Sequence, residues 1–82
     1  MKKEVKLTEL LPGEKGIVNH LTLRGLERRR LMDLGFVKGS VVEVIRRSMF
    51  GDPTAYFIKG SVIALRREEA DEILVIKIDE GD

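Results

Sequence analysis

The stretch ERRRLMDLGFVKGS, residues 27–40, sets three consecutive arginines just ahead of a Leu-Gly-Phe sequence. The leucines in and before it predict a helix from about Leu23 to Leu34, because a rotation of ~100° per residue gathers them on one face. The leucines of this face are Leu23, Leu26, Leu31 and Leu34. Gly35 can supply the left-handed residue that ends a helix, and Phe36 can then pack back on the last turn. The stretch thus predicts an amphipathic helix whose end is fixed by its own sequence.

The three arginines occupy different positions on this helix. By the same rotation Arg30 falls within the apolar face, so we expect its methylene stem to lie on the core and its guanidinium to reach a carboxylate or carbonyl at the edge. Arg28 and Arg29 fall at the margins of the face or outside it, and Met32 points away from it. A basic cluster of this kind is usually a solvated or salt-bridged helix face, and Asp33 offers Arg29 a counter-charge four residues on. Because no aromatic residue interleaves with the arginines to stack bases, a phosphate-binding patch is disfavoured.

The rest of the chain has the pattern of short β-strands separated by turns. The predicted strands lie at residues 16–21, within 39–48, and at 54–58, 61–65 and 73–78, with one helical turn in REEADE at 67–72. In the second of these strands Val42 and Val44 share one side. Five short strands in so small a chain favour a strongly bent antiparallel barrel, because closure hides strand edges. The expected fold class is mainly β, with one or two short helices and the longer helix inserted after the first strand.

Length, charge and cysteine content limit the classes of protein that the chain can belong to. The 82 residues predict one domain, over residues 1–78, and a mobile acidic tail at 79–82. Fifteen Lys and Arg against 14 Asp and Glu give a net charge of +1, which is not the balance of a dedicated nucleic-acid binder. Cysteine is absent, which fits a reducing cytoplasm, and no run approaches the ~20 apolar residues of a membrane span. We therefore expect a cytoplasmic protein that neither binds nucleic acid nor inserts into a membrane.

The loop SMFGDPT, residues 48–54, places two large apolar side chains beside a Gly, an Asp and a Pro. Apolar side chains on a loop are costly unless they fold inward or meet a partner. In one interpretation Phe50 plugs an end of the barrel and Asp52-Pro53 only makes a turn. In the other, Met49, Phe50, Asp52 and Pro53 form a surface that contacts a partner. The outward helix residues Arg28, Arg29 and Met32 are a second candidate surface, because Arg and Met are enriched at interfaces.

No residue of the sequence is predicted to be catalytic or to hold a cofactor or a metal. His20 is the sole histidine, and without a cysteine or a second histidine it cannot complete a catalytic triad or a tight soft-metal site. The tail carboxylates of Asp79, Glu80 and Asp82 could hold a hard cation weakly, but the tail would first have to be ordered. The chain also lacks the Gly-rich phosphate-binding motif of a GTPase. We therefore expect a protein that is not an enzyme and that acts by contact.

Four pieces of the sequence, in this order, resemble the FeoA family of ferrous iron transport accessory proteins. They are LTELLPGEKGIV (7–18), RRLMDLGFVKGS (29–40), MFGDP (49–53) and GSVIALRREEADEILV (60–75). The family commonly carries a proline where this chain has Lys38, which bears only on the stiffness of that turn. The resemblance implies a small cytoplasmic protein with an SH3-like barrel. It also implies a partner, FeoB, the membrane transporter of Fe(II) that has a cytoplasmic GTP-binding domain.

The resemblance favours a non-catalytic adaptor or regulator of ferrous iron uptake that acts by contact with FeoB. Two alternatives remain open at the level of the sequence. A similar fold occurs as the C-terminal domain of metal-dependent repressors of the diphtheria-toxin-repressor type, and small barrels of other families bind nucleic acid. Self-association is a further expectation, because a five-stranded barrel with an imperfectly closed edge can pair with a second copy.

Overall fold

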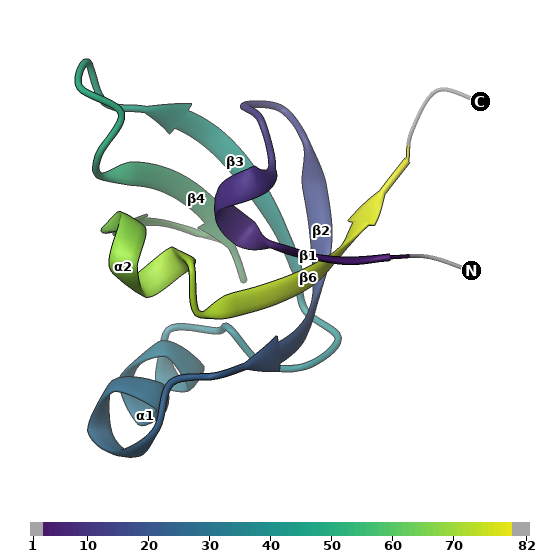
Figure 1. The fold of residues 1–82 in the computed structure, drawn as a ribbon, viewed down its shortest axis with the longest axis vertical. Coiled ribbons are helices and arrows are strands. Elements are labelled where there is room, and N and C mark those ends of the chain that lie inside the picture. The colour runs from purple at the N-terminus through teal and green to yellow at the C-terminus, as the bar shows by residue number, and fades with distance from the viewer. Residues whose placement is uncertain (1–2, 80–82) are drawn as a thin grey trace.

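The computed structural model describes residues 3–79 and shows a strongly bent antiparallel sheet with two short helices on its outside (Figure 1). The elements are β1 (Glu4–Lys6), the 3-10 turn η1 (Leu7–Glu9), β2 (Lys15–Leu21), α1 (Gly25–Asp33), β3 (Val41–Arg47), β4 (Thr54–Ile58), β5 (Ser61–Leu65), α2 (Arg67–Ala70) and β6 (Ile73–Ile78). The mainly β fold class predicted from the sequence is confirmed. Of the predicted acidic tail only Asp79 lies within the described residues, and residues 80–82 lie outside them.

Within residues 3–79 the sheet has six strands, so the predicted number of five is wrong. Its order is β1-β6-β2-β3-β4-β5, and the strand that the sequence did not indicate is β1. This strand is three residues long and exists through its pairing with β6, in which Glu4 lies opposite Ile76 and Lys6 opposite Leu74. As a consequence α1 follows the second strand of the chain, not the first. The order also leaves β1 and β5 as the two edges of the sheet, which is bent but not closed.

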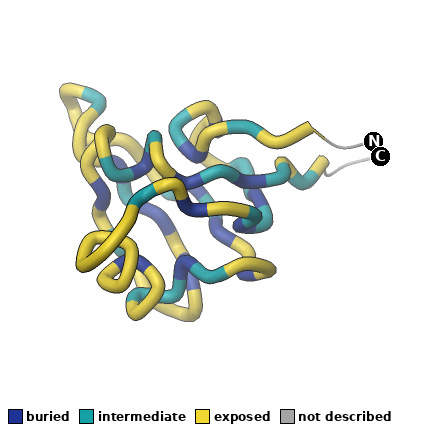
Figure 2. Tube along the Cα trace, turned by 60° about the horizontal axis from the view of Figure 1, so that its bottom comes forward, coloured by how far each residue is buried: buried dark blue, intermediate teal, exposed yellow. Residues whose placement is uncertain are grey.

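The concave side of the sheet holds a single hydrophobic core. Val42 and Val44 of β3 are both buried, as their shared side of the strand predicted. Figure 2 shows the buried segments gathered in the middle of the molecule, with exposed segments around them. The core side chains come from η1, all the longer strands, both helices and the segments beside them: Leu7, Leu10, Val18, Leu21, Leu31, Phe36, Val42, Val44, Tyr56, Ile58, Leu65, Ala70, Ile73 and Val75.

The end of α1 has the geometry that the sequence predicted. Gly35 has a φ of +113°, which a residue with a side chain rarely adopts. Its N–H donates to the Met32 carbonyl at 3.0 Å, and the N–H of Phe36 donates to the Leu31 carbonyl at 3.0 Å. These two bonds make a Schellman motif, in which the residue after the glycine packs on the last turn. Phe36 and Leu31 are both fully buried, so this motif anchors the end of α1 to the core.

The start of α1 differs from the prediction. The helix begins at Gly25, not at Leu23, and Leu26 is 87% exposed instead of facing the core. Gly25 has a φ of +63°, so the helical rotation does not extend back to Leu23 and cannot place Leu23 and Leu26 on one face. Leu23 packs at the margin of the core from the loop before the helix. Only the second half of α1 is therefore docked on the sheet.

Arg30 joins the two helices in the way that its position predicted. Its guanidinium donates to a carboxylate oxygen of Glu69, at the start of α2. The Arg30 side chain is 55% exposed and that of Glu69 is 24% exposed, so the contact lies at the edge of the core. The same carboxylate accepts the backbone N–H of Arg66 at 3.1 Å and so also caps α2. Glu69 thus fixes α2 and offers α1 an anchor.

The strands of the second half of the chain match their predicted bounds. Thr54–Ile58 and Ser61–Leu65 form a hairpin whose turn is Lys59-Gly60, with φ angles of +51° and +80°. Positive φ at both central residues is the signature of the tight turn that suits the twist of a hairpin. Among residues 3–79, no helix is both long enough and apolar enough to span a membrane.

Candidate functional site

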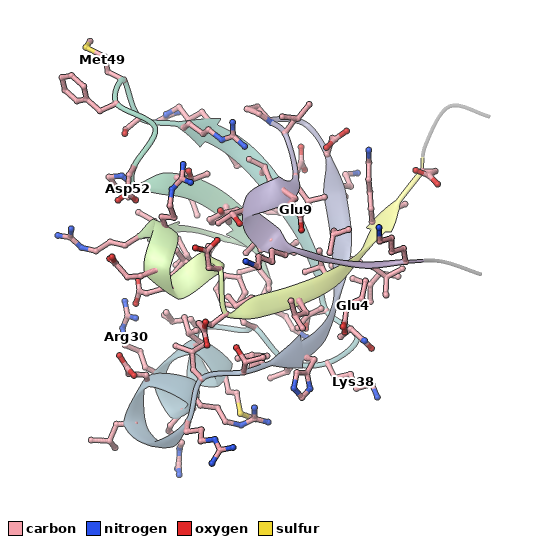
Figure 3. The ribbon with its side chains drawn as sticks, viewed as in Figure 1. Glu4, Glu9, Arg30, Lys38, Met49 and Asp52 are labelled. Atoms are coloured by element: carbon pink, nitrogen blue, oxygen red, sulfur yellow. The ribbon has the colours of Figure 1, made fainter. Side chains whose placement is uncertain are left out.

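The loop between β3 and β4 carries the two most exposed large apolar side chains of the described residues. Met49 and Phe50 are each 91% exposed. Figure 3 shows Met49 at the far end of this loop, pointing away from the body of the molecule. Phe50 therefore does not plug an end of the barrel, and the inward interpretation of this loop is wrong. We call four residues of this loop between β3 and β4 the hairpin tip: Met49, Phe50, Asp52 and Pro53.

Backbone contacts hold the hairpin tip in place. The N–H of Ser48 donates to the Pro53 carbonyl at 3.1 Å, and the N–H of Gly51 donates to the Ser48 carbonyl at 2.9 Å. The Asp52 carboxylate accepts the backbone N–H of Arg67 at 2.9 Å, which ties the tip to the start of α2. Because the backbone is fixed at both ends of the loop, the apolar side chains are presented to solvent on a defined support.

The base of this hairpin is basic outside and apolar inside. Four exposed arginines lie in the adjoining elements, two at the end of β3, one just after β5 and one at the start of α2: Arg46, Arg47, Arg66 and Arg67. Arg47 donates to the Leu10 carbonyl at 3.0 Å, which fixes its guanidinium against η1. Tyr56 lies beneath, and burial raises its pKa above the ordinary value of 10.0, so that the phenol stays neutral at physiological pH.

The second predicted surface, on α1, is only partly the open face that the sequence indicated. Arg29 is 79% exposed and its guanidinium lies 4.0 Å from the Asp33 carboxylate, as the spacing predicted. Met32 is 38% exposed. Arg28, however, turns back to β2, where its Nη1 donates to the Leu21 carbonyl at 2.9 Å. This surface lies at one end of the longest axis of the molecule and the β3–β4 loop lies at the other (Figure 1), so the structure does not bring the two predicted surfaces together.

Two hollows flank Arg28, and they contain residues that the sequence did not single out as a site. The larger, of about 470 Å³, lies between the end of β2 and the start of α1. The smaller, of about 240 Å³, lies between β2, α1 and the segment that follows the helix. Both are lined by His20, Leu21 and Arg28, and they add Arg24 on one side and Lys38 on the other. These residues come from β2, the start of α1 and the segment after the helix, and the fold brings these three parts of the chain together.

The described part of the chain holds no group of three or more His, Cys, Asp or Glu side chains that could bind a metal ion. His20 is exposed on β2 at the rim of the hollows. No residue was predicted from the sequence to hold a metal or a cofactor or to be catalytic, so there is no such residue to locate in the structure. The arrangement is suited to binding a partner. It presents an apolar loop at one end of the molecule and two hollows lined by cationic side chains at the other.

Comparison with known proteins gives a family match over nearly the whole chain. The model of the FeoA domain matches residues 5–77. A protein of Porphyromonas gingivalis, described as a fusion of Fe(2+) transport protein A with the Fe(2+) transporter FeoB, is 34% identical over 71 residues. The aligned region covers 87% of this chain but only 8% of that protein. The relative therefore carries a domain like this one and the transporter in a single polypeptide.

Solved structures of FeoA proteins have the same fold. The FeoA protein of Chlorobium tepidum has a TM-score of 0.86 and 39% identity, with 94% of this chain and 75% of that chain covered. The FeoA of Stenotrophomonas maltophilia, described as an SH3 domain protein in complex with zinc, has a TM-score of 0.77 and 31% identity, with 87% and 88% covered. A manganese-dependent transcriptional repressor has a TM-score of 0.83 at only 19% identity, which shows a shared fold and nothing more.

Proposed function

Because this chain belongs to the FeoA domain family, we propose that it is a non-catalytic cytoplasmic adaptor in ferrous iron uptake that binds the transporter FeoB. We assign the contact on FeoB to its cytoplasmic GTP-binding part. The natural fusion of the two proteins in a relative supports their working together, because joined chains commonly act at one place.

The observation that carries the proposal is the exposure of Met49 and Phe50, each 91% open to solvent. Burying two such side chains would remove substantial apolar area from water, which is the main driving force of most protein association. Their support is already ordered by the bonds of Ser48 and Asp52, so little loop entropy has to be lost on binding. Arg47, held against η1, and Arg67, whose N–H binds Asp52, add polar groups beside this apolar centre, and a polar rim around an apolar centre is typical of interfaces.

The test measures the affinity of the purified chain for detergent-solubilised FeoB of the same organism and, separately, for its soluble GTP-binding part. We expect both to bind, and the double variant Met49→Ala/Phe50→Ala to bind about 30-fold more weakly, which corresponds to a loss of ~2 kcal/mol. The thermal midpoint of unfolding should not change, because neither side chain contributes to the core.

A matched control is Val62→Ala, which also shortens an exposed apolar side chain, 62% open to solvent, but on β5. It should leave the affinity for FeoB unchanged. Equal affinities of the wild type and the double variant would refute the hairpin tip as the contact. Binding to neither form of FeoB would refute the adaptor function itself.

A further inference from the structure

Arg28 is an exposed arginine that the fold holds in one place. Its Nη1 donates to the Leu21 carbonyl at the end of β2. A guanidinium has five N–H donors, so this bond leaves the others for a ligand while it fixes the plane of the group. An ion pair with a fixed arginine costs less side-chain entropy than one with a more exposed arginine, such as the neighbouring Arg29, whose partner Asp33 is itself on the surface. Arg28 is thus the better placed of the two to bind an anion.

The two hollows beside Arg28 are lined by positively charged side chains. Three of the residues that line them are Arg or Lys, namely Arg24, Arg28 and Lys38, and His20 lines both hollows. No Asp or Glu of the described residues lines either hollow, although the whole chain has 15 Lys and Arg against 14 Asp and Glu. We call the two hollows together the Arg28 groove. Its lining is complementary to a negatively charged ligand.

Two carboxylates beside the groove have hydrogen-bond partners of their own. Glu4 accepts a hydrogen bond from the side-chain amide of Asn19. Glu72 accepts one from the hydroxyl of Thr22 at 2.6 Å. Asn19 and Thr22 line the hollows, so these two carboxylates lie at the edge of the groove, whereas the hydrogen bond of Arg28 is with the uncharged Leu21 carbonyl.

The groove is also partly apolar. Leu21 and Phe36 line it from the core, and Met32, 38% exposed, lines the smaller hollow. Methionine adapts its shape to an incoming apolar side chain. The lining holds two rings, the buried Phe36 and the exposed imidazole of His20, whereas sites for single-stranded nucleic acid offer several aromatic side chains on which successive bases stack. A ligand with carboxylates and apolar side chains along an extended chain fits both properties.

We propose that the Arg28 groove binds an acidic peptide segment of a partner protein, with a carboxylate on the Arg28 guanidinium and an apolar side chain beside Met32. This site lies at the opposite end of the molecule from the hairpin tip and does not depend on it (Figure 1). In Figure 3, Lys38 and Arg30 lie on opposite sides of this end of the molecule, so the groove uses the side of α1 that faces away from α2.

The experiment titrates the full chain, labelled with nitrogen-15, with a capped peptide of alternating glutamate and leucine and follows the backbone amide signals. We expect saturable shifts at His20, Leu21, Arg28, Met32 and Lys38. The same peptide with glutamine for glutamate should bind at least about tenfold more weakly, because a hydrogen bond between charged groups is the stronger kind. Tighter binding of a thymidine oligonucleotide of the same charge would overturn the peptide assignment in favour of nucleic acid.

Two variants on the same helix distinguish binding in the groove from a general effect of net charge on the affinity. Arg28→Gln should weaken the glutamate peptide about tenfold or more, whereas Arg29→Gln, which removes the same charge outside the groove, should change the affinity less than about twofold. If Arg28→Gln lowers the thermal midpoint strongly, Lys38→Gln serves as the second test, because this exposed residue lies in a loop.

Three results would overturn the proposal: equal effects of Arg28→Gln and Arg29→Gln, shifts confined to the arginines at the hairpin base, or no saturable binding. The double variant Met49→Ala/Phe50→Ala should bind the peptide as the wild type does. The experiments can therefore refute the Arg28 groove without refuting the hairpin tip as the contact with FeoB, and the reverse.

Discussion

Glu14 shows how a single surface residue links the acid stability of the molecule to its fold. Its carboxylate accepts the backbone N–H of Leu11 at 2.8 Å and pairs with the Lys77 ammonium, also at 2.8 Å. The hydrogen bond from Leu11 is the larger cause, and the pairing with Lys77 the next, of a pKa of Glu14 that lies below its ordinary value of 4.5. The folded state therefore favours the ionised carboxylate more than the unfolded chain does.

The expected consequence is a stability contribution that is complete above pH 4.5 and is lost as the pH falls through the lowered pKa of Glu14. In Glu14→Gln this contribution is absent at every pH, so the free energies of unfolding of the two proteins should converge in acid. Urea unfolding of both proteins between neutral pH and about pH 2 measures the difference. A difference that stays constant over this range would contradict the assignment.

At the same scale, the sequence could identify Met49 and Phe50 as loop residues but could not decide where they point. A Phe in a short loop has the same local sequence whether it plugs the barrel or faces solvent. The backbone of the loop is tied to α2 by the Asp52 bond to Arg67, a contact between separate elements that the local sequence does not reveal. The Arg28 groove was unpredictable for a similar reason, because Arg28 reaches back across a loop to Leu21 and Lys38 joins them from beyond the helix.

Among the elements, α1 provides the sharpest test because it has one buried and one exposed leucine. Leu31→Ala should lower the free energy of unfolding by about 2–5 kcal/mol, because it leaves a cavity in a fully buried site. Leu26→Ala should change it by less than about 0.5 kcal/mol, because that side chain is 87% exposed. Urea denaturation of both variants makes the comparison. Similar losses for the two leucines would mean that α1 is docked along its whole length.

The elements that could be predicted from the sequence are those whose ends are set by local chemistry. Gly35 fixes the end of α1, and Lys59-Gly60 fixes the turn between β4 and β5. β1 was missed because three residues are too few to establish an alternation, and the strand depends on its pairing with Leu74–Ile76. Leu26 was placed wrongly because it lies in the first turn of α1, about 140° around the helix from the buried Leu31, and that side of the turn faces solvent.

On the scale of the whole molecule, the open sheet has one edge that invites pairing. β1 is short and carries Glu4 and Lys6, which discourage contact with another strand. β5, with the sequence SVIAL, has no charged residue and pairs with β4 alone among the described strands. We therefore expect the protein to self-associate at high concentration by antiparallel pairing of β5 with β5 of a second copy.

Sedimentation velocity over a range of concentrations tests this expectation. The average mass of the wild type should rise with concentration, and Ala64→Lys, on the exposed β5, should abolish the rise because a charge on an edge strand opposes pairing. The control Val41→Lys places the same charge on an exposed residue of the inner strand β3 and should leave the association intact. Loss of association in both variants would assign it to the sheet face instead of its edge.

The antiparallel pairing of β1 with β6 sets Glu4 opposite Ile76. The start of β1 and the end of β6 therefore lie on the same side of the fold, away from the hairpin tip (Figure 1). A tether attached on that side could hold a neighbouring domain without obstructing the tip. Short flexible tethers give effective concentrations in the millimolar range. When the two partners share one polypeptide, even a contact with a dissociation constant of about 1 mM would then be occupied much of the time. A free-standing adaptor has no such help, so its tip has to supply the whole affinity.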